Sequence, residues 1–197
     1  MLNLYFIRHG QTQWNTDKKL QGRTNIPLNE QGIAQIKAYQ LPEKLKQLQW
    51  FSSPLLRTRE TAELLGVNAA SEQHLIEMNW GDWEGKTLKD ISAADPIEFA
   101  AQEALGFDLN PPQGESPRMV AERVTTWAEQ LAAMSANQDI GCVSHKGVIR
   151  AVYALAANWD MKAKAPQKMD FHCAQHFCFD GSEWSIGELN IALKTKL

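Results

Sequence analysis

The stretch LYFIRHGQTQWN (residues 4–15) places reactive side chains directly after a pattern that predicts a buried strand. Its apolar run, Leu4 to Ile7, has the composition of a strand, and Arg8 and His9 follow it without a spacer. In open α/β sheets, ligands bind beyond the carboxyl ends of the strands. A guanidinium and an imidazole at such a strand end therefore form the first candidate functional position.

The segment WFSSPLLRTRETAELLG (residues 50–66) shows the same order, a strand followed by a charged side chain. We predict a short strand and then a helix, with Ser53 as its N-cap, Pro54 at its first position and Gly66 at its end. This places Arg57 in the first helical turn.

A third segment, IGCVSHKGVIRAVYAL (residues 140–155), predicts a strand from Ile140 to Val143, a turn over residues 144–147 and a helix beyond. His145 then ends a strand, as His9 does.

Other stretches of the chain complete an α/β pattern, in which apolar runs alternate with helical periodicity and no internal repeat or linker intervenes. One helix is predicted to follow Asn29 and to end before Pro42. A second begins with Ser116 and Pro117, and its predicted apolar face is made of Val120, Val124, Trp127, Leu131 and Met134. A hairpin is predicted over residues 170–179 and 184–191 around the turn signal DGSE.

The size and composition of the chain favour a single domain over residues 1–197. The 197 residues are 44% hydrophobic and 22% charged, which suits one compact domain. The least regular segment, around residues 68–116, contains prolines and glycines and is interpreted as an insertion that covers a pocket.

Charge and cysteine content limit the partners and the compartment. A net charge of −3 without a basic block argues against nucleic-acid binding, and no window of the sequence is apolar enough to predict a membrane span. The three cysteines, Cys142, Cys173 and Cys178, are odd in number and sparse, which favours a reducing compartment, and we expect a cytoplasmic protein. No pattern in the chain specifies an oligomeric state.

If the three strand ends meet, two guanidiniums and two imidazoles converge, from Arg8, His9, Arg57 and His145. The chain has neither a P-loop nor a nicotinamide-binding fingerprint, and no serine triad or carboxylate pair accompanies these residues. Guanidinium groups match phosphoryl oxygens bidentately, a helix N-terminus adds amide donors, and a histidine can itself be the nucleophile. The set therefore predicts phosphoryl transfer on a small phosphorylated substrate.

No metal or other cofactor is expected. In HCAQHFC (residues 172–178), His172 and His176 would lie about 13 Å apart on one strand, which is too far for one ion.

Trp80 and Trp83 fit either the core or the leaving-group pocket. Three further charged residues are expected to hold helix ends or to pair locally: Arg59, Glu115 and Arg150.

Five motifs in order, RHGQTQWN (8–15), SSPLLRTRETA (52–62), EMNWGDWEG (77–85), GES (114–116) and SHKG (144–147), resemble those of the histidine phosphatase superfamily, also called the phosphoglycerate mutase-like family. The resemblance spans nearly the whole chain. It implies an α/β fold with a mixed, mostly parallel sheet sandwiched between helices, and a phosphohistidine intermediate.

Carried over residue by residue, the resemblance implies a role for each motif position. His9 is the nucleophile, Glu77 is the proton donor, and the phosphoryl group is gripped by Arg8, Arg57 and His145. The phosphate site is lined by Asn15, Gln21 and Gly22. Lys146 stands where the family often has glycine, so it either binds a second anionic group of the substrate or points into water.

The resemblance favours the compact phosphatase branch, because the chain is short compared with the mutases of the family. We expect a metal-independent phosphomonoester hydrolase for a sugar phosphate, a phosphoglycerate or an α-ribazole phosphate, since PPQGES (111–116) is similar to a stretch of α-ribazole phosphatases. The alternatives are a phosphoglycerate mutase-type isomerase, which would depend on added 2,3-bisphosphoglycerate, and a non-catalytic phospho-ligand binder.

Overall fold

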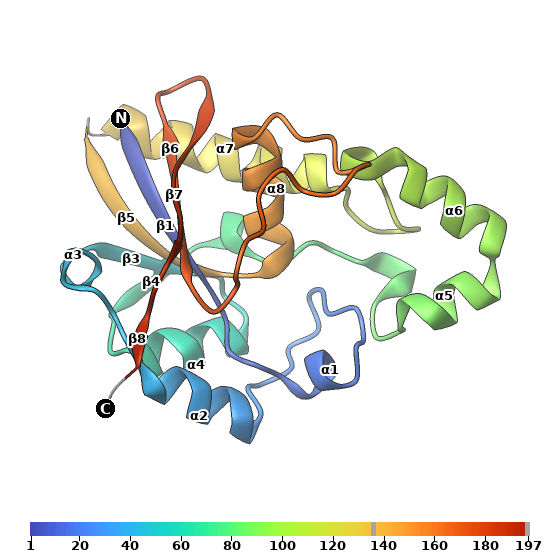
Figure 1. Ribbon diagram of the computed structural model, residues 1–197, viewed down its shortest axis with the longest axis horizontal. Coiled ribbons are helices and arrows are strands. Elements are labelled where there is room, and N and C mark those ends of the chain that lie inside the picture. The colour runs from blue at the N-terminus through green and yellow to red at the C-terminus, as the bar shows by residue number, and fades with distance from the viewer. Residues whose placement is uncertain (135–136, 196–197) are drawn as a thin grey trace.

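A six-stranded sheet with the order β4-β3-β5-β1-β6-β7 organises the protein (Figure 1). The computed structural model describes residues 1–134 and 137–195. The parallel part of the sheet is built from β1 (Leu2–Arg8), β3 (Gln49–Ser52), β4 (Ala69–Ser71) and β5 (Gln138–Ser144). Two antiparallel strands, β6 (Ala174–Phe179) and β7 (Trp184–Ile191), extend the β1 side. The predicted mixed, mostly parallel sheet is confirmed.

Helices cover both faces of this sheet, and β1 shows how they do so. Leu2, Leu4 and Phe6 belong to the core cluster shared with α7 (Pro117–Met134) and α8 (Lys146–Ala156). Tyr5 and Ile7 point the other way, into the cluster that contains residues of α3 (Glu43–Lys46) and α4 (Leu56–Leu65). α2 (Glu30–Ala38) packs beside α4 (Figure 1), and a small second sheet pairs β2 (Tyr39–Gln40) with β8 (Lys194–Thr195).

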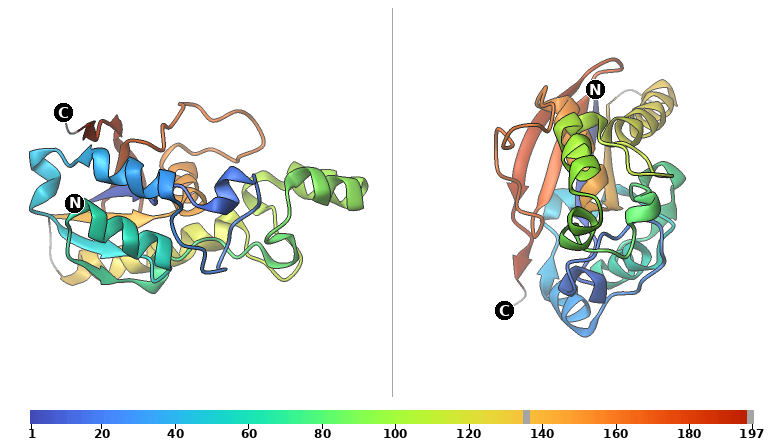
Figure 2. Two further views of the ribbon diagram at one scale, coloured as in Figure 1. Left: turned by 90° about the horizontal axis from the view of Figure 1, so that it is seen from below. Right: turned by 90° about the vertical axis from the view of Figure 1, so that its right-hand side faces the viewer.

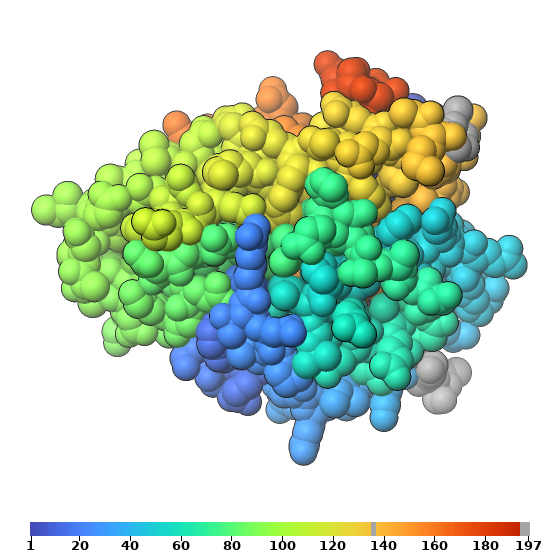
Figure 3. Space-filling model, turned by 180° about the vertical axis from the view of Figure 1, so that it is seen from behind, coloured from blue at the N-terminus to red at the C-terminus, as the bar shows by residue number. Residues whose placement is uncertain are grey.

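The segment between β4 and α7 is the most irregular part of the chain. It contains three short 3₁₀ helices, η1 (Gln73–Leu75), η2 (Gly81–Trp83) and η3 (Gly106–Asp108), and two α-helices, α5 (Leu88–Ala94) and α6 (Pro96–Leu105). α5 and α6 project away from the sheet (Figure 2). From behind, blue residues of the N-terminal segment, which includes α1 (Gln13–Thr16), lie between this green segment and the teal residues of α4 (Figure 3).

Most predicted helix boundaries agree with the structure. Asn29 caps α2, the Ser116 hydroxyl accepts a hydrogen bond from the Met119 amide at the start of α7, and Gly66 ends α4 with a φ of 74°. The predicted start of α4 is wrong. The helix begins at Leu56, after an N-cap at Leu55, and the Leu56 amide donates to the Asn25 side chain at 2.7 Å and not to Ser53. The Ser53 hydroxyl instead accepts from the Leu55 amide and contacts the His145 ring.

Three smaller predictions also need correction. Met134 is 80% exposed because it is the last residue of α7 and lies beyond the core that the earlier turns cover. β6 begins at Ala174 and not at residue 170, since Asp170 accepts a turn hydrogen bond from the Cys173 amide. α8 begins already at Lys146, within the predicted turn. No helix in the described part of the chain is both long enough and apolar enough to cross a membrane.

Candidate active site

The carboxyl ends of β1 and β5 lie side by side and bring two histidines together. Arg8 pairs with Ser144 in the parallel register, and the His9 amide donates to the Ser144 carbonyl at 3.0 Å. The next residues along the two strands are His9 and His145, whose ring centroids are 5.2 Å apart. The sequence therefore placed both imidazoles at the correct end of the sheet.

The surroundings of His9 fix its tautomer and its charge. Its Nδ1 lies 2.7 Å from the Gly10 carbonyl oxygen, which can only accept, so Nδ1 carries the proton and the lone pair is on Nε2. Burial lowers the pKa of His9 well below 6.5, and the positive charges of Arg8 and Arg57 lower it further. His9 is thus a neutral imidazole with a free Nε2 at physiological pH.

Arg57 is completely buried and is held by backbone oxygens. Its two terminal nitrogens donate to the Thr24 carbonyl at 3.1 Å and to the Gly22 carbonyl at 2.7 Å. Burial lowers the pKa of Arg57 to about 10, so the guanidinium is still charged at pH 7. Gly22 acts on the site through this bond, and it is tightly enclosed, because a Cβ there would lie 2.7 Å from the Glu84 carboxylate.

His145 is also fully buried, with its Nε2 2.8 Å from the Ser53 hydroxyl. Burial, followed by the charge of Arg57, lowers the pKa of His145 well below 6.5. Ser53 is a site residue that the sequence reasoning assigned to helix capping. The signal that could have found it is its position directly after β3, the same strand-end position that singled out His9 and His145.

Glu77 enters the site from the segment between η1 and η2. One carboxylate oxygen accepts from the Met78 amide at 2.9 Å, and the other accepts from the Gly147 amide at 3.3 Å. Burial raises the pKa of Glu77, an effect that these hydrogen bonds and Arg57 oppose. Gly147 is required by the close approach of the two residues, because a Cβ on it would lie 2.4 Å from the Glu77 Oε1.

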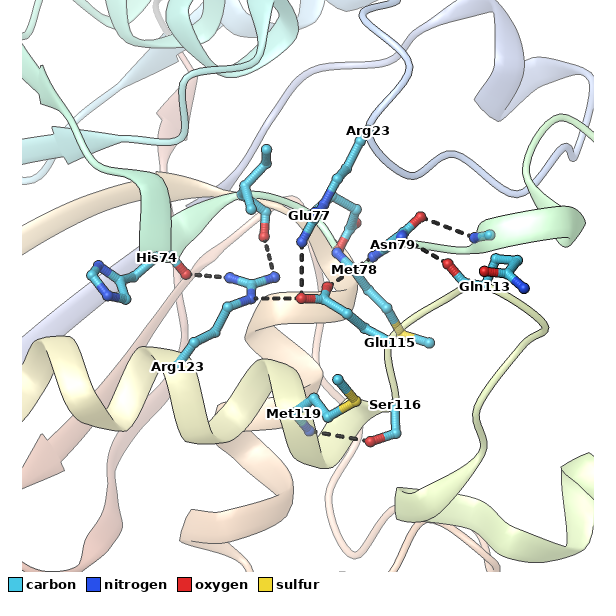
Figure 4. A network of polar contacts seen from close by, with 12 residues as sticks. Arg23, His74, Glu77, Met78, Asn79, Gln113, Glu115, Ser116, Met119 and Arg123 are labelled. Atoms are coloured by element: carbon cyan, nitrogen blue, oxygen red, sulfur yellow. Dashed lines mark hydrogen bonds and ion pairs between the residues drawn. The ribbon is translucent and has the colours of Figure 1, made fainter.

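A network of polar contacts holds the segment that carries Glu77 (Figure 4). On one side, Arg123 of α7 donates to the carbonyls of His74 and Ile76. On the other side, Glu115 accepts from the Asn79 amide at 2.9 Å. Glu115 also pairs with Arg123 at 3.4 Å and with Arg23 at 2.8 Å, so the two clamps are linked. Glu115 was expected to pair locally, but its shortest ion pair joins it to Arg23, 92 residues away, and only Arg123 is a partner near in sequence. Arg123 was not predicted as a site residue.

A cavity of about 710 Å³ opens above His9. Six of the predicted site residues line it: Arg8, His9, Asn15, Gln21, Glu77 and Lys146. Arg57, His145 and Gly22 are buried and are not among the residues that line it. Trp80 lines the cavity, whereas Trp83 is buried against Phe99, with ring centroids 5.7 Å apart.

The structure changes the predictions for Arg150 and for His172. Arg150 does not pair at a helix end but lines the cavity, while Arg59 is exposed on α4. His172 lies in the turn before β6, not on that strand, and contacts Gln35 and Tyr39 at the cavity rim. Among residues 1–134 and 137–195, no cluster of three His, Cys, Asp or Glu side chains could hold a metal ion.

The polar groups around His9 are arranged for an anion. Gln21 accepts from the Thr12 hydroxyl at 2.8 Å, which leaves its amide nitrogen buried without a partner. The Nε atoms of Arg8 and Arg57 are likewise buried and unpartnered within the described residues. Unpaired buried donors are rare in folded proteins and commonly mark functional positions. Two of these donors, on Arg8 and Gln21, belong to residues that line the same cavity as the neutral His9, and the charges of Arg8 and Arg57 both act on the His9 ring.

A sequence model of the histidine phosphatase superfamily (branch 1) matches residues 4–192. The chain belongs to the histidine phosphatase superfamily. It is 29% identical to phosphoglycerate mutase-like protein 4 of Arabidopsis thaliana over 188 residues, which cover 91% of this chain and 81% of that protein. It is also 31% identical to the adenosylcobalamin/alpha-ribazole phosphatase of Salmonella typhimurium over 160 residues, 78% of each chain.

Solved structures with phosphatase titles share the fold. A mycobacterial glucosyl-3-phosphoglycerate phosphatase in complex with VO3 superposes with a TM-score of 0.81 at 26% identity, covering 96% of this chain and 99% of that chain. A putative alpha-ribazole-5'-P phosphatase from Escherichia coli gives a TM-score of 0.81 at 25% identity, covering 100% and 98%. The family and fold predicted from the five motifs are therefore confirmed.

Proposed function

We propose that this histidine phosphatase hydrolyses a small phosphomonoester through a phosphohistidine on His9. The observation that carries the proposal is the state of His9: a neutral imidazole with its proton fixed on Nδ1 and its Nε2 lone pair free, beside the guanidinium groups of Arg8 and Arg57. A neutral lone pair is what attack on phosphorus requires, and fixed positive charge stabilises the equatorial oxygens during transfer.

In the first step, Nε2 of His9 forms a bond to phosphorus while the bond from phosphorus to the ester oxygen breaks. Glu77 gives its proton to the departing alkoxide, and a neighbouring phosphate dianion raises the pKa of Glu77 beyond the effect of burial. His145 supplies a hydrogen bond to the phosphoryl oxygens as charge develops.

In the second step, the Glu77 carboxylate takes a proton from a water molecule, whose oxygen attacks the phosphohistidine. The bond from Nε2 to phosphorus breaks, inorganic phosphate leaves, and both His9 and Glu77 return to their starting states. The guanidinium groups of Arg8 and Arg57 supply the positive charge in this scheme, and the neutral His145 supplies a hydrogen bond, so we propose that the reaction needs no metal ion.

The substrate belongs to the class of small phosphorylated metabolites, with sugar phosphates, phosphoglycerates and α-ribazole phosphates as the leading types. The relatives support this range, since one carries the name alpha-ribazole phosphatase and another the name glucosyl-3-phosphoglycerate phosphatase.

We also propose a cytoplasmic location, because Cys142, Cys173 and Cys178 are all free.

A second candidate function is phosphoglycerate mutase activity. Its support is a 32% identity over 152 residues to a protein named probable phosphoglycerate mutase GpmB, from Erwinia tasmaniensis. A mutase of this kind depends on added 2,3-bisphosphoglycerate, whereas a hydrolase releases inorganic phosphate without it.

Intact-mass analysis of the protein after acid-free quenching tests the proposed nucleophile. With a phosphomonoester, the wild type should acquire one phosphoryl adduct, and His9→Ala should acquire none and should release no phosphate. His176→Ala is the matched control, because that ring stacks on Tyr5 outside the cavity, and it should retain the adduct. An adduct on serine or aspartate would refute the role of His9.

A further inference from the structure

α8 directs two cationic side chains at the cavity from one face. Lys146 and Arg150 are four residues apart, which places them one above the other on a helix, and both line the cavity. The Lys146 Nζ lies 5.5 Å from the centre of the Phe171 ring, and the Arg150 Cζ lies 5.3 Å from the Trp159 ring. The aromatic rings hold both cations near the cavity wall.

No carboxylate neutralises these two cations. In the described part of the chain, neither forms an ion pair, whereas Lys19 on the cavity rim has Asp17 at 3.9 Å. After burial, Arg8 and Arg150 are the largest influences that lower the pKa of Lys146, and both exceed the opposing effect of Glu77. A chain with 23 acidic residues and a net charge of −3 thus leaves one wall of its cavity positive.

The transferred phosphoryl group does not account for this excess of charge. The proposed function assigns its binding to Arg8, Arg57 and His145, of which Arg8 and Arg57 lower the pKa of His9 by their charge and His145 lies 5.2 Å from His9 between ring centroids. Arg150 is one helical turn beyond Lys146, a rise of about 6 Å along α8, so it faces a part of the substrate away from the reacting phosphorus. The other carboxylate that lines the cavity, Glu103, comes from α6 and not from this wall.

We propose that Lys146 and Arg150 form a subsite for a second anionic group of the substrate. This inference rests on the proposed function and narrows its substrate class to phosphomonoesters that carry a carboxylate or a second phosphate. Both groups have the oxygen geometry that a guanidinium binds bidentately and that an ammonium binds as a point charge. The centre of the Phe171 ring lies 6.0 Å from the Arg8 Cζ and 5.5 Å from the Lys146 Nζ, so the positions proposed for the two anionic groups are neighbours across one aromatic ring.

The test compares matched pairs of probes by calorimetric titration of the His9→Ala variant, which cannot turn them over. One pair is 3-phosphoglycerate and glycerol 1-phosphate, which differ by a carboxylate. The other pair is fructose 1,6-bisphosphate and fructose 6-phosphate, which differ by a phosphate. In at least one pair, the probe with the second anion should bind about tenfold more tightly or better.

Removing the cations should remove this preference. Lys146→Met and Arg150→Met, each added to His9→Ala, should reduce the ratio of the two affinities about fivefold or more, and the double substitution should bring it close to one. Arg150→Lys keeps the charge and should retain part of the ratio. Lys37→Met is the matched control, since Lys37 is exposed on α2 away from the cavity, and it should leave the ratio unchanged.

The outcomes separate this inference from the proposed function. A phosphohistidine and turnover, combined with equal binding within both pairs, would overturn the subsite and leave the hydrolase standing. A preference that survives the double substitution would also overturn it. A preference that depends on Lys146 and Arg150 in a protein without turnover would support the subsite and refute the hydrolase.

Discussion

Gly147→Ala should separate catalysis from stability, because it adds one methyl group against the carboxylate of Glu77. The new Cβ would lie 2.4 Å from Oε1 and 3.2 Å from Cδ, whereas ordinary contacts begin at 3.4 Å. The carboxyl group must therefore move by about 1 Å, and a displacement of that size costs on the order of 100-fold in rate. That factor corresponds to about 2.7 kcal/mol of activation free energy.

The same substitution should not weaken the fold. Gly147 lies in α8, where alanine is favoured over glycine by up to about 1 kcal/mol. The movement is confined to the end of a side chain, while the Met78 Cβ, at 3.5 Å, is at an ordinary contact distance. We expect kcat for an alkyl phosphate to fall about 100-fold while the free energy of unfolding is unchanged or rises.

A double-mutant cycle with Glu77→Ala provides the control. Once the carboxyl group is gone, Gly147→Ala has nothing to displace and should cost no further activity. The measurements are kcat with glycerol 1-phosphate and urea unfolding for the four proteins of the cycle. A Gly147→Ala variant that keeps kcat within about threefold, or one that loses as much activity in the Glu77→Ala background, would refute the reasoning.

Three further predictions concern the proton donor, metal ions and pH. Glu77→Gln should still release p-nitrophenol from p-nitrophenyl phosphate in a burst equal to the enzyme concentration, followed by a slow steady state, since p-nitrophenolate leaves without a proton. Rapid mixing measures the burst. A phosphorylation step that slows equally with p-nitrophenyl phosphate and with an alkyl phosphate would contradict the role of Glu77 as proton donor. Incubation with a chelator should leave activity unchanged. The contrary result would be purified protein that contains stoichiometric zinc and loses its activity when the chelator removes that zinc. Burial keeps the pKa of His9 and His145 well below 6.5, so the unfolded state binds more protons in acid than the folded state does. The free energy of unfolding should therefore fall as the pH drops below about 6.5, by up to about 1.4 kcal/mol per pH unit for each histidine. Urea titrations at about pH 7 and pH 5.5 measure this fall, and an unchanged pH dependence in His145→Gln would show that His145 does not contribute.

The sequence predicted the strand ends well because their signal is local. An apolar run that stops at Arg8, or just before Ser144, marks both a strand and its end, and the parallel register then brings His9 and His145 together. Fold class and family followed from five such local motifs in order.

Features that depend on contacts between distant segments were missed or misassigned. Ser53 has the sequence of a helix cap, but its hydrogen bond to His145 connects positions 92 residues apart. The Arg123 clamp reaches back 49 residues to the His74 carbonyl, and nothing in the spacing of either segment predicts it. Arg150 was expected to pair locally, and the turn predicted over residues 144–147 left Lys146 outside the helix. Since α8 begins at Lys146, the two side chains lie on one helical face.

The position of β1 between β5 and β6 also constrains how the protein is made. Asn3 pairs with Asp139, 136 residues later, so both edges of β1 are unpaired while the intervening chain is translated. At ordinary rates of synthesis this interval is on the order of ten seconds. During it, the apolar stretch Leu4–Ile7 has no native strand partner and is available to holdase chaperones or to other nascent chains. His9 leaves the ribosome early, yet it gains its partner His145 only when about three quarters of the chain has been synthesised.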